Sequence, residues 1–196
     1  MPTARIHGAD LYYERHGEGP PLVFAHGIGG NHLSWWQQVP HFRDRYTCVA
    51  FDHPGFGRSA LAPGEHSFVD CLGALLDELR LDRVGLVAQS MGGRTCLGYT
   101  LRHPERVGAL VMASTMFPLD LPEFGDWRRE SGRSFKALAA QGIHAAVGAT
   151  MAREQPVLSF LYQEISALNP PWSPSNPPPG SLRVPDAGSE ALRGFA

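Results

Sequence analysis

Short apolar runs alternate with helix-like stretches over the first 115 residues of the chain. A segment near the start, "ARIHGADLYYERHG", holds two short strand patterns around a Gly-Ala-Asp turn and therefore predicts a hairpin. Four further runs have the length and apolar composition of buried strands. These runs cover residues 21–27, 46–55, 83–90 and 107–115.

Helical patterns separate these runs. The stretch "SFVDCLGALLDELR" (67–80) repeats apolar residues with helical spacing, and Ser67 and Asp70 at its start have the spacing of a capping box. A second helix is predicted over residues 91–102, because the following His103-Pro104 pair cannot continue a helix. Strands that alternate with helices, several of them fully apolar, predict an α/β fold with a mostly parallel sheet covered by helices on both faces.

The chain divides into three predicted parts. Residues 1–115 carry the strand–helix alternation of the core. Residues 116–168 are helical in composition without a strand-like run, as is typical of a helical cap inserted after a strand. Residues 169–196 contain seven prolines, and half of them are Pro, Gly or Ser, so we expect a disordered tail there.

Composition and charge narrow the function classes. A net charge of −2 over 196 residues provides no basic field for phosphate groups, so no nucleic acid is expected as a partner. No apolar run approaches the roughly 20 residues that cross a bilayer, and the first residues lack the layout of a signal peptide. Three cysteines without CxxC spacing indicate reduced, buried thiols. The expected setting is cytoplasmic, with no membrane partner.

Three glycine-bearing loops follow three of the apolar runs: "HGIGGN" (26–31), "DHPGFGRS" (52–59) and "AQSMGG" (88–93). Ligands bind beyond the carboxyl ends of parallel strands, so these loops are expected to converge. Together, in this order and spacing, they resemble the α/β-hydrolase family. The resemblance covers residues 1–168 and is strongest to capped bacterial esterases, enol-lactonases and carbon–carbon hydrolases.

The resemblance assigns roles to the loop residues. It places Ser90 as the nucleophile at a strained strand-to-helix elbow, although a serine there could instead merely cap the following helix. It implies an oxyanion hole made by the backbone N–H groups of Ile28 and Met91. His26, Gly27 and Gly92 are expected to position these loops. In addition, Asp52 matches an aspartate that braces the loop rather than one that acts as the triad acid.

Four aromatic residues are candidates for an apolar substrate pocket, and core packing is the alternative for each of them. One of the two adjacent tryptophans is expected to pack in the core and the other to wall the pocket. The nine histidines show no ligand pair at helical spacing beside acids, so neither a metal nor another cofactor is expected. The four aromatic candidates are Trp35, Trp36, Phe117 and Trp127.

A serine nucleophile needs a histidine base and a carboxylate, which follow it in this family in the order Ser, Asp, His. No histidine follows His144, which lies inside the cap-like region. The resemblance thus implies that the last two strands and the triad Asp and His are missing from this sequence. Without those strands, the run at 107–115 would form an exposed sheet edge through which copies could associate.

Two functions remain open at this point. The first is a serine hydrolase that acts on a small apolar ester, lactone or related carbonyl substrate. The second is a catalytically inactive homologue that binds a small molecule or a partner.

Overall fold

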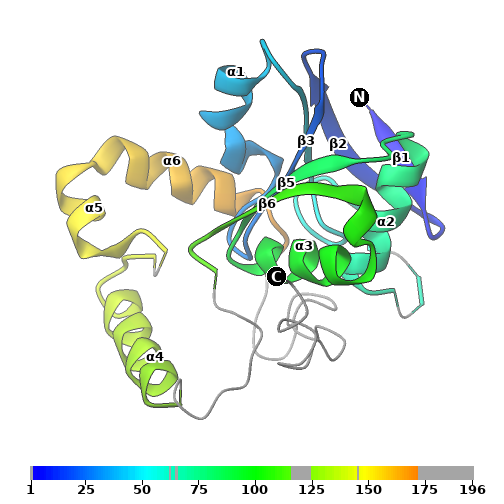
Figure 1. Ribbon diagram of the computed structural model, residues 1–196. Coiled ribbons are helices and arrows are strands. Elements are labelled where there is room, and N and C mark those ends of the chain that lie inside the picture. The colour runs from blue at the N-terminus through cyan, green and yellow to red at the C-terminus, as the bar shows by residue number, and fades with distance from the viewer. Residues whose placement is uncertain (1, 62, 65, 116–124, 145, 172–196) are drawn as a thin grey trace.

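Six strands form one mixed sheet in the computed structural model, which describes residues 2–61, 63–64, 66–115, 125–144 and 146–171 (Figure 1). Their order across the sheet is β1-β2-β4-β3-β5-β6. The first two strands run antiparallel to their neighbours, whereas β4, β3, β5 and β6 are parallel. The strands are β1 (Thr3–Ile6), β2 (Ala9–His16), β3 (Pro21–Ala25), β4 (Thr47–Phe51), β5 (Val84–Gln89) and β6 (Val107–Ala113). The α/β-hydrolase fold expected from the sequence is confirmed.

The hairpin of β1 and β2 turns at two residues with positive φ, His7 (47°) and Gly8 (80°). This pairing of Ile6 with Ala9 across a two-residue loop is the geometry of a type I′ turn, which matches the twist of the two strands. The predicted Gly-Ala-Asp turn is therefore displaced, because Ala9 is already paired in β2.

The central parallel strands β3 and β4 are mostly buried on both faces, as their apolar runs predicted, whereas β6 at the edge of the sheet is largely exposed. Alternate residues of β3 and β4 point to opposite sides, so Val23 and Val49 belong to one core cluster while Phe24 and Ala50 belong to another. The first cluster packs under α2 (Phe68–Glu78) and α3 (Met91–Arg102), and the second under η1 (His32–Trp35) and α1 (Gln38–Phe42).

Two predicted helices and the state of the cysteines are confirmed. The capping box of α2 is complete, because Ser67 accepts from the N–H of Asp70 while the Asp70 side chain accepts from Ser67. Helix α3 has the predicted bounds, and a short turn, η2 (Pro104–Arg106), follows it. Cys48, Cys71 and Cys96 are free and buried.

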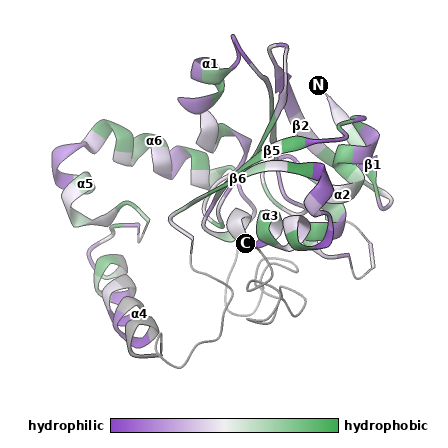
Figure 2. Cartoon of the chain, viewed as in Figure 1, coloured by the Kyte–Doolittle hydropathy of each residue, from purple (hydrophilic) through white to green (hydrophobic). Residues whose placement is uncertain are grey.

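Three helices follow β6: α4 (Gly125–Ala139), α5 (Gly148–Glu154) and α6 (Pro156–Ala167). Figure 1 shows them reaching away from the sheet, with α6 returning toward the core. Hydrophobic residues run along β5, whereas hydrophobic and hydrophilic residues alternate along α6 (Figure 2). The helical region is interrupted between α4 and α5: Gly142 takes a positive φ of 70° there, and Gly148, the first residue of α5, takes one of 74°.

Asn169, the first residue of the predicted tail, is buried and hydrogen-bonded to the core. Most of the predicted tail, from residue 172 onward, lies outside the described residues.

Strand β6 is paired along one edge only in the part of the chain that the structure describes. Val111 on this strand is 54% exposed. Self-association through this edge stays a prediction. No helix among the described residues is long and apolar enough to span a bilayer.

Candidate active site

Ser90 lies at a strained corner between β5 and α3. Its φ of 50° and ψ of −113° lie outside the regions that non-glycine residues favour, which costs on the order of 1–3 kcal/mol. The Ser90 side chain makes no capping hydrogen bond to α3, so helix capping does not explain this serine. Bonds to its neighbours hold the corner: the Ser90 N–H donates to Ala113 at 3.1 Å, and its carbonyl accepts from the Thr115 hydroxyl at 2.9 Å.

Glycines permit the close approach of the loops around Ser90. A Cβ at Gly92 would overlap the Ala25 carbonyl and lie 2.8 Å from the carbonyl oxygen of His26. A Cβ at Gly27 would overlap the Gln89 carboxamide and lie 3.1 Å from the Ser90 Cβ. The elbow and the loop after β3 are therefore in direct contact, as the convergence of the glycine loops predicted.

The loop after β3 is folded around the Gly27 carbonyl. This oxygen accepts from the Gly30 N–H at 3.0 Å and from the Nδ1–H of His26 at 2.8 Å. By contrast, the backbone N–H groups of Ile28 and Met91 donate to no other group in the described part of the chain. Two free N–H donors thus belong to the two loops that meet at Ser90.

His26 is a buried, neutral connector. Its Nε2 accepts from the backbone N–H of His53 at 3.0 Å, and the Nδ1 of His53 lies 3.2 Å from the same atom. The Nε2 of His53 in turn lies 3.1 Å from the hydroxyl of Thr95 on α3. Burial lowers the pKa of His26 to about 4, and burial together with His26 lowers that of His53 well below its usual range. These bonds tie the loop after β3 to the loop after β4.

Asp52 is fully buried, and both its oxygens are occupied by these loops. It accepts from the backbone N–H of His32 at 2.6 Å, from the His32 ring at 2.9 Å, and from the Arg58 N–H at 2.8 Å. These contacts join η1 to the loop after β4, so Asp52 orients loops and no contact brings it to Ser90.

Two asparagines that sequence reasoning missed connect the cap to the core. The Asn31 side chain donates to the carbonyl of Ile165 in α6 at 2.7 Å. Asn169 donates to the Gly30 carbonyl at 3.1 Å and accepts from the Gly57 N–H at 2.9 Å. Asn31 ends the "HGIGGN" motif and so could have been singled out, whereas nothing in the sequence signals Asn169.

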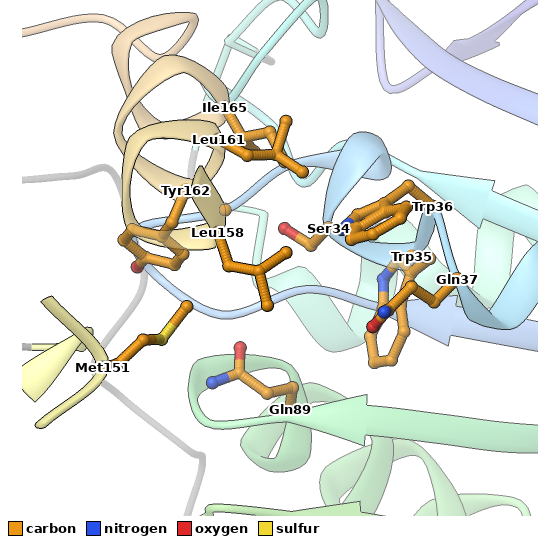
Figure 3. A pocket seen from close by; sticks show the side chains of 11 residues that line it. Ser34, Trp35, Trp36, Gln37, Gln89, Met151, Leu158, Leu161, Tyr162 and Ile165 are labelled. Atoms are coloured by element: carbon orange, nitrogen blue, oxygen red, sulfur yellow. The ribbon is translucent and has the colours of Figure 1, made fainter. Parts of the chain in front are cut away.

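A pocket of about 230 Å³ lies between helices α5 and α6 on one side and the loop after β3 with the end of β5 on the other (Figure 3). Trp35 is 7% exposed and packs on Phe24, whereas Trp36 is 45% exposed, and both tryptophans contribute to the wall. Gln89, the residue before Ser90, extends its side chain into the pocket (Figure 3). The lining consists of Gly30, Ser34, Trp35, Trp36, Gln37, Gln89, Met151, Leu158, Leu161, Tyr162 and Ile165. Phe117 and the side chain of Trp127, also predicted to line a pocket, lie outside the described residues.

His144 approaches the same loops from the cap. Its ring packs on Tyr162 with the centroids 4.9 Å apart, and a Cβ at Gly29 would lie 3.4 Å from it. None of the hydrogen bonds of the described residues joins a histidine ring to Ser90. No group of three or more metal-binding side chains occurs within the described ranges.

Known proteins are similar to this chain in sequence and in fold. The family model described as alpha/beta hydrolase fold matches residues 20–142. A protein of Azorhizobium caulinodans named as a carbamate hydrolase, RutD, is 32% identical over 165 residues, which are 83% of this chain and 58% of that protein. The 3-oxoadipate enol-lactonase 2 of Acinetobacter baylyi is 34% identical over 100 residues, 49% of this chain and 37% of that protein.

Among solved structures, Est816, described as an N-acyl homoserine lactone degrading enzyme, superposes with a TM-score of 0.68 at 29% identity. That match covers 95% of this chain and 71% of the other. A thermophilic esterase from Thermogutta terrifontis shares the fold, with a TM-score of 0.73 at 22% identity over 95% of this chain and 74% of its own. This chain belongs to the alpha/beta hydrolase fold family.

Proposed function

We propose that this chain carries the nucleophile and the oxyanion hole of a serine hydrolase that acts on a small apolar ester, lactone or related carbonyl compound. The observation that carries the proposal is the strained Ser90 corner, where the side chain is free of any capping bond and the loop of Gly27 is in contact. A strained serine between a strand and a helix is how this fold presents a nucleophile.

In the proposed reaction, the Ser90 Oγ attacks the carbonyl carbon of the substrate. A new carbon–oxygen bond forms, and the carbonyl π electrons move to its oxygen as an oxyanion. The backbone N–H groups of Ile28 and Met91 donate to this oxyanion, each contributing about 3–4 kcal/mol in the transition state. Collapse of the intermediate re-forms the carbonyl and expels the alkoxide, which takes a proton from water and becomes the alcohol. The acyl group left on Ser90 is then transferred to water, which releases the carboxylic acid and restores the Ser90 hydroxyl. His26, Gly27 and Gly92 act by holding the two loops together.

The Ser90 proton must pass to a base. In the described part of the chain His26 is bonded to His53, and His32 to Asp52, so these rings serve the loops rather than Ser90. We propose that the triad Asp and His are not supplied by this sequence. Loss of a triad histidine costs about 10⁶ in turnover and leaves roughly 10³–10⁴ over the reaction in water.

The relatives support the substrate class. Their names describe a carbamate hydrolase, an enol-lactonase and an enzyme that degrades an acyl homoserine lactone. Each compound in these names contains a carbonyl carbon bonded to oxygen or nitrogen. The curated relatives are longer than this chain, which spans 58% and 37% of the two described above.

A fluorophosphonate probe tests the nucleophile without requiring turnover. The Ser90 Oγ forms a bond to phosphorus, its proton passes to solvent and fluoride leaves, so the labelled protein gains the mass of the probe less that of HF. We expect labelling of the wild type at Ser90 and none of Ser90→Ala, whereas Ser134→Ala, at an exposed position of α4, labels normally. Equal labelling of Ser90→Ala would refute the proposal.

The second candidate is a binding protein without turnover, favoured by the lack of a histidine bonded to Ser90. Cleavage of p-nitrophenyl acetate separates the two functions. Slow cleavage that disappears in Ser90→Ala supports the hydrolase, while ligand binding with a rate equal to that of Ser90→Ala supports the binding protein.

A further inference from the structure

The pocket between the cap and the loops has no charged lining. Cap side chains form one wall, and η1 with the residue before Ser90 forms the other (Figure 3). Among the described residues, none of the lining side chains is Lys, Arg, Asp or Glu. On α5, Arg153 and Glu154 pair with each other, with 70% and 58% of their side chains exposed, and Glu164 on α6 is exposed as well.

An uncharged pocket discriminates between ligands by charge. Burial of a carboxylate without a cationic partner costs several kcal/mol, whereas burial of an alkyl chain is favourable. A substrate whose chain ends in a carboxylate would lose water at that end and find no cation among the described residues that line this pocket. A neutral chain incurs no such penalty.

The Gln89 side chain is the polar group best placed to distinguish between ligands in this pocket. Its carboxamide extends from the elbow toward Leu158 on α6 (Figure 3) and makes no hydrogen bond in the described part of the chain. A carboxamide can both donate and accept, and it carries no charge. A ligand amide, carbonyl or hydroxyl could therefore bond to it, and a bond made inside an apolar pocket is strongly orienting.

We propose that this pocket takes a neutral, mainly apolar substrate chain with one uncharged hydrogen-bonding group, which Gln89 recognises, and that it rejects chains ending in a carboxylate. This inference rests on the proposed function, since it names the substrate class of the same site. Gln89 acts as a specificity-determining residue, separate from the attack by Ser90.

Two matched esters test the proposal: monomethyl adipate, which ends in a carboxylate, and methyl 6-amino-6-oxohexanoate, which ends in an amide. Both have the same chain and the same reacting ester. Binding is measured in Ser90→Ala at pH 7.5, so that hydrolysis does not interfere, through the fluorescence of Trp35 and Trp36 in the pocket wall. We expect the amide ester to bind at least 10-fold more tightly than the carboxylate ester.

Variants then assign the preference to Gln89. Gln89→Leu is expected to weaken the amide ester at least 5-fold and to leave the carboxylate ester unchanged. Gln89→Arg is expected to reverse the preference, and Leu158→Arg supplies a cation to the same pocket from the cap if the elbow does not accept arginine. Gln141→Leu, at an exposed carboxamide beyond α4, is the matched control and changes neither affinity.

Equal affinities for the two esters, no binding of either, or an unchanged preference in Gln89→Leu would each overturn the proposal. Its failure is distinguishable from failure of the hydrolase proposal. Fluorophosphonate labelling of Ser90 without the ester preference removes only the substrate class. The ester preference without labelling removes only the nucleophile.

Discussion

The candidate site has two sides that are held together by different contacts. The core side consists of the loops after β3, β4 and β5, and the cap side consists of helices α5 and α6. On the core side, the elbow and its two neighbouring loops are joined by buried backbone contacts and by the side chains of His26, His53 and Asp52, all fully buried. On the cap side, large apolar residues remain in solvent, with Val157 77% and Phe160 61% exposed. Asn31 and Asn169 provide side-chain hydrogen bonds between the sides.

This difference between the core side and the cap side matches two separate requirements of a hydrolase site. In the reaction that we propose, attack on a carbonyl needs fixed donors and a fixed nucleophile, and we assign these to the backbone N–H groups and the Ser90 elbow of the core side. Substrate selection needs only side chains of suitable shape and polarity, and α5 and α6 supply five of the eleven described residues that line the pocket. Substitutions on the cap can therefore alter selectivity while the loops stay unchanged, in keeping with the range of activities that one fold supports.

The largest difference in the free energy of unfolding is expected between alanine substitutions at two glycines. Gly92→Ala would place a methyl group in overlap with the Ala25 carbonyl, 2.6 Å from its carbon, at the end of the sheet where the candidate site lies. We expect a loss of about 3–5 kcal/mol in the free energy of unfolding. Gly132→Ala in α4 has nothing within 4 Å and should gain about 0.5–1 kcal/mol. Urea unfolding measures both, and equal effects would contradict the contrast.

The core side should also make stability depend on pH. The pKa of His26 falls to about 4 on folding because of burial, so the unfolded chain binds a proton that the folded chain excludes between about pH 6.5 and 4. Stability is therefore complete above pH 6.5 and is lost as the pH falls, by about 2 kcal/mol at pH 5 from His26 alone. His53 adds to the loss in the same direction.

Unfolding free energies at pH 7.5 and pH 5 check this expectation. The variant His41→Gln, at an exposed histidine of α1, should retain the full dependence. A wild-type protein whose stability does not change between the two pH values would show that the His26–His53 pair is not buried in neutral form.

The connection between the two sides can be weakened at one residue. Asn169→Ala removes a donor from the Gly30 carbonyl and an acceptor from the Gly57 N–H, and we expect a loss of about 1–3 kcal/mol. Leu168→Ala, at a neighbouring residue that is 56% exposed, is the control with little effect. Hydrogen exchange should show faster exchange in α6 of Asn169→Ala. Unchanged exchange would mean that the cap is held by other contacts.

The sequence predicted those elements that are determined by residues close together in the chain. The start of α2 followed from Ser67 and Asp70, three residues apart, and β3, β4 and β5 followed from unbroken apolar runs. The elbow was predictable because its glycines stand beside Ser90 in the chain, where close packing requires them.

The rest depends on contacts between distant parts of the chain. Asn169 is hydrogen-bonded to Gly30, which lies 139 residues earlier in the chain. A pattern in the local sequence cannot reveal such a contact. The pairing of His26 with His53 spans 27 residues, and no spacing rule connects two loops that meet only after the sheet has formed. Likewise, the role of Gln89 becomes visible only when α6 is placed over it.

The smallest effect is expected deep in the core, away from both sides of the site. Tyr99 is 1% exposed, and its hydroxyl has no hydrogen-bond partner in the described part of the chain. Replacement by phenylalanine keeps the ring contacts and removes an unsatisfied polar group, so Tyr99→Phe should leave the free energy of unfolding within about 0.5 kcal/mol or raise it by about 1 kcal/mol. Urea unfolding would contradict this if the variant lost more than about 1 kcal/mol, because such a loss requires a hydrogen bond from the Tyr99 hydroxyl in solution.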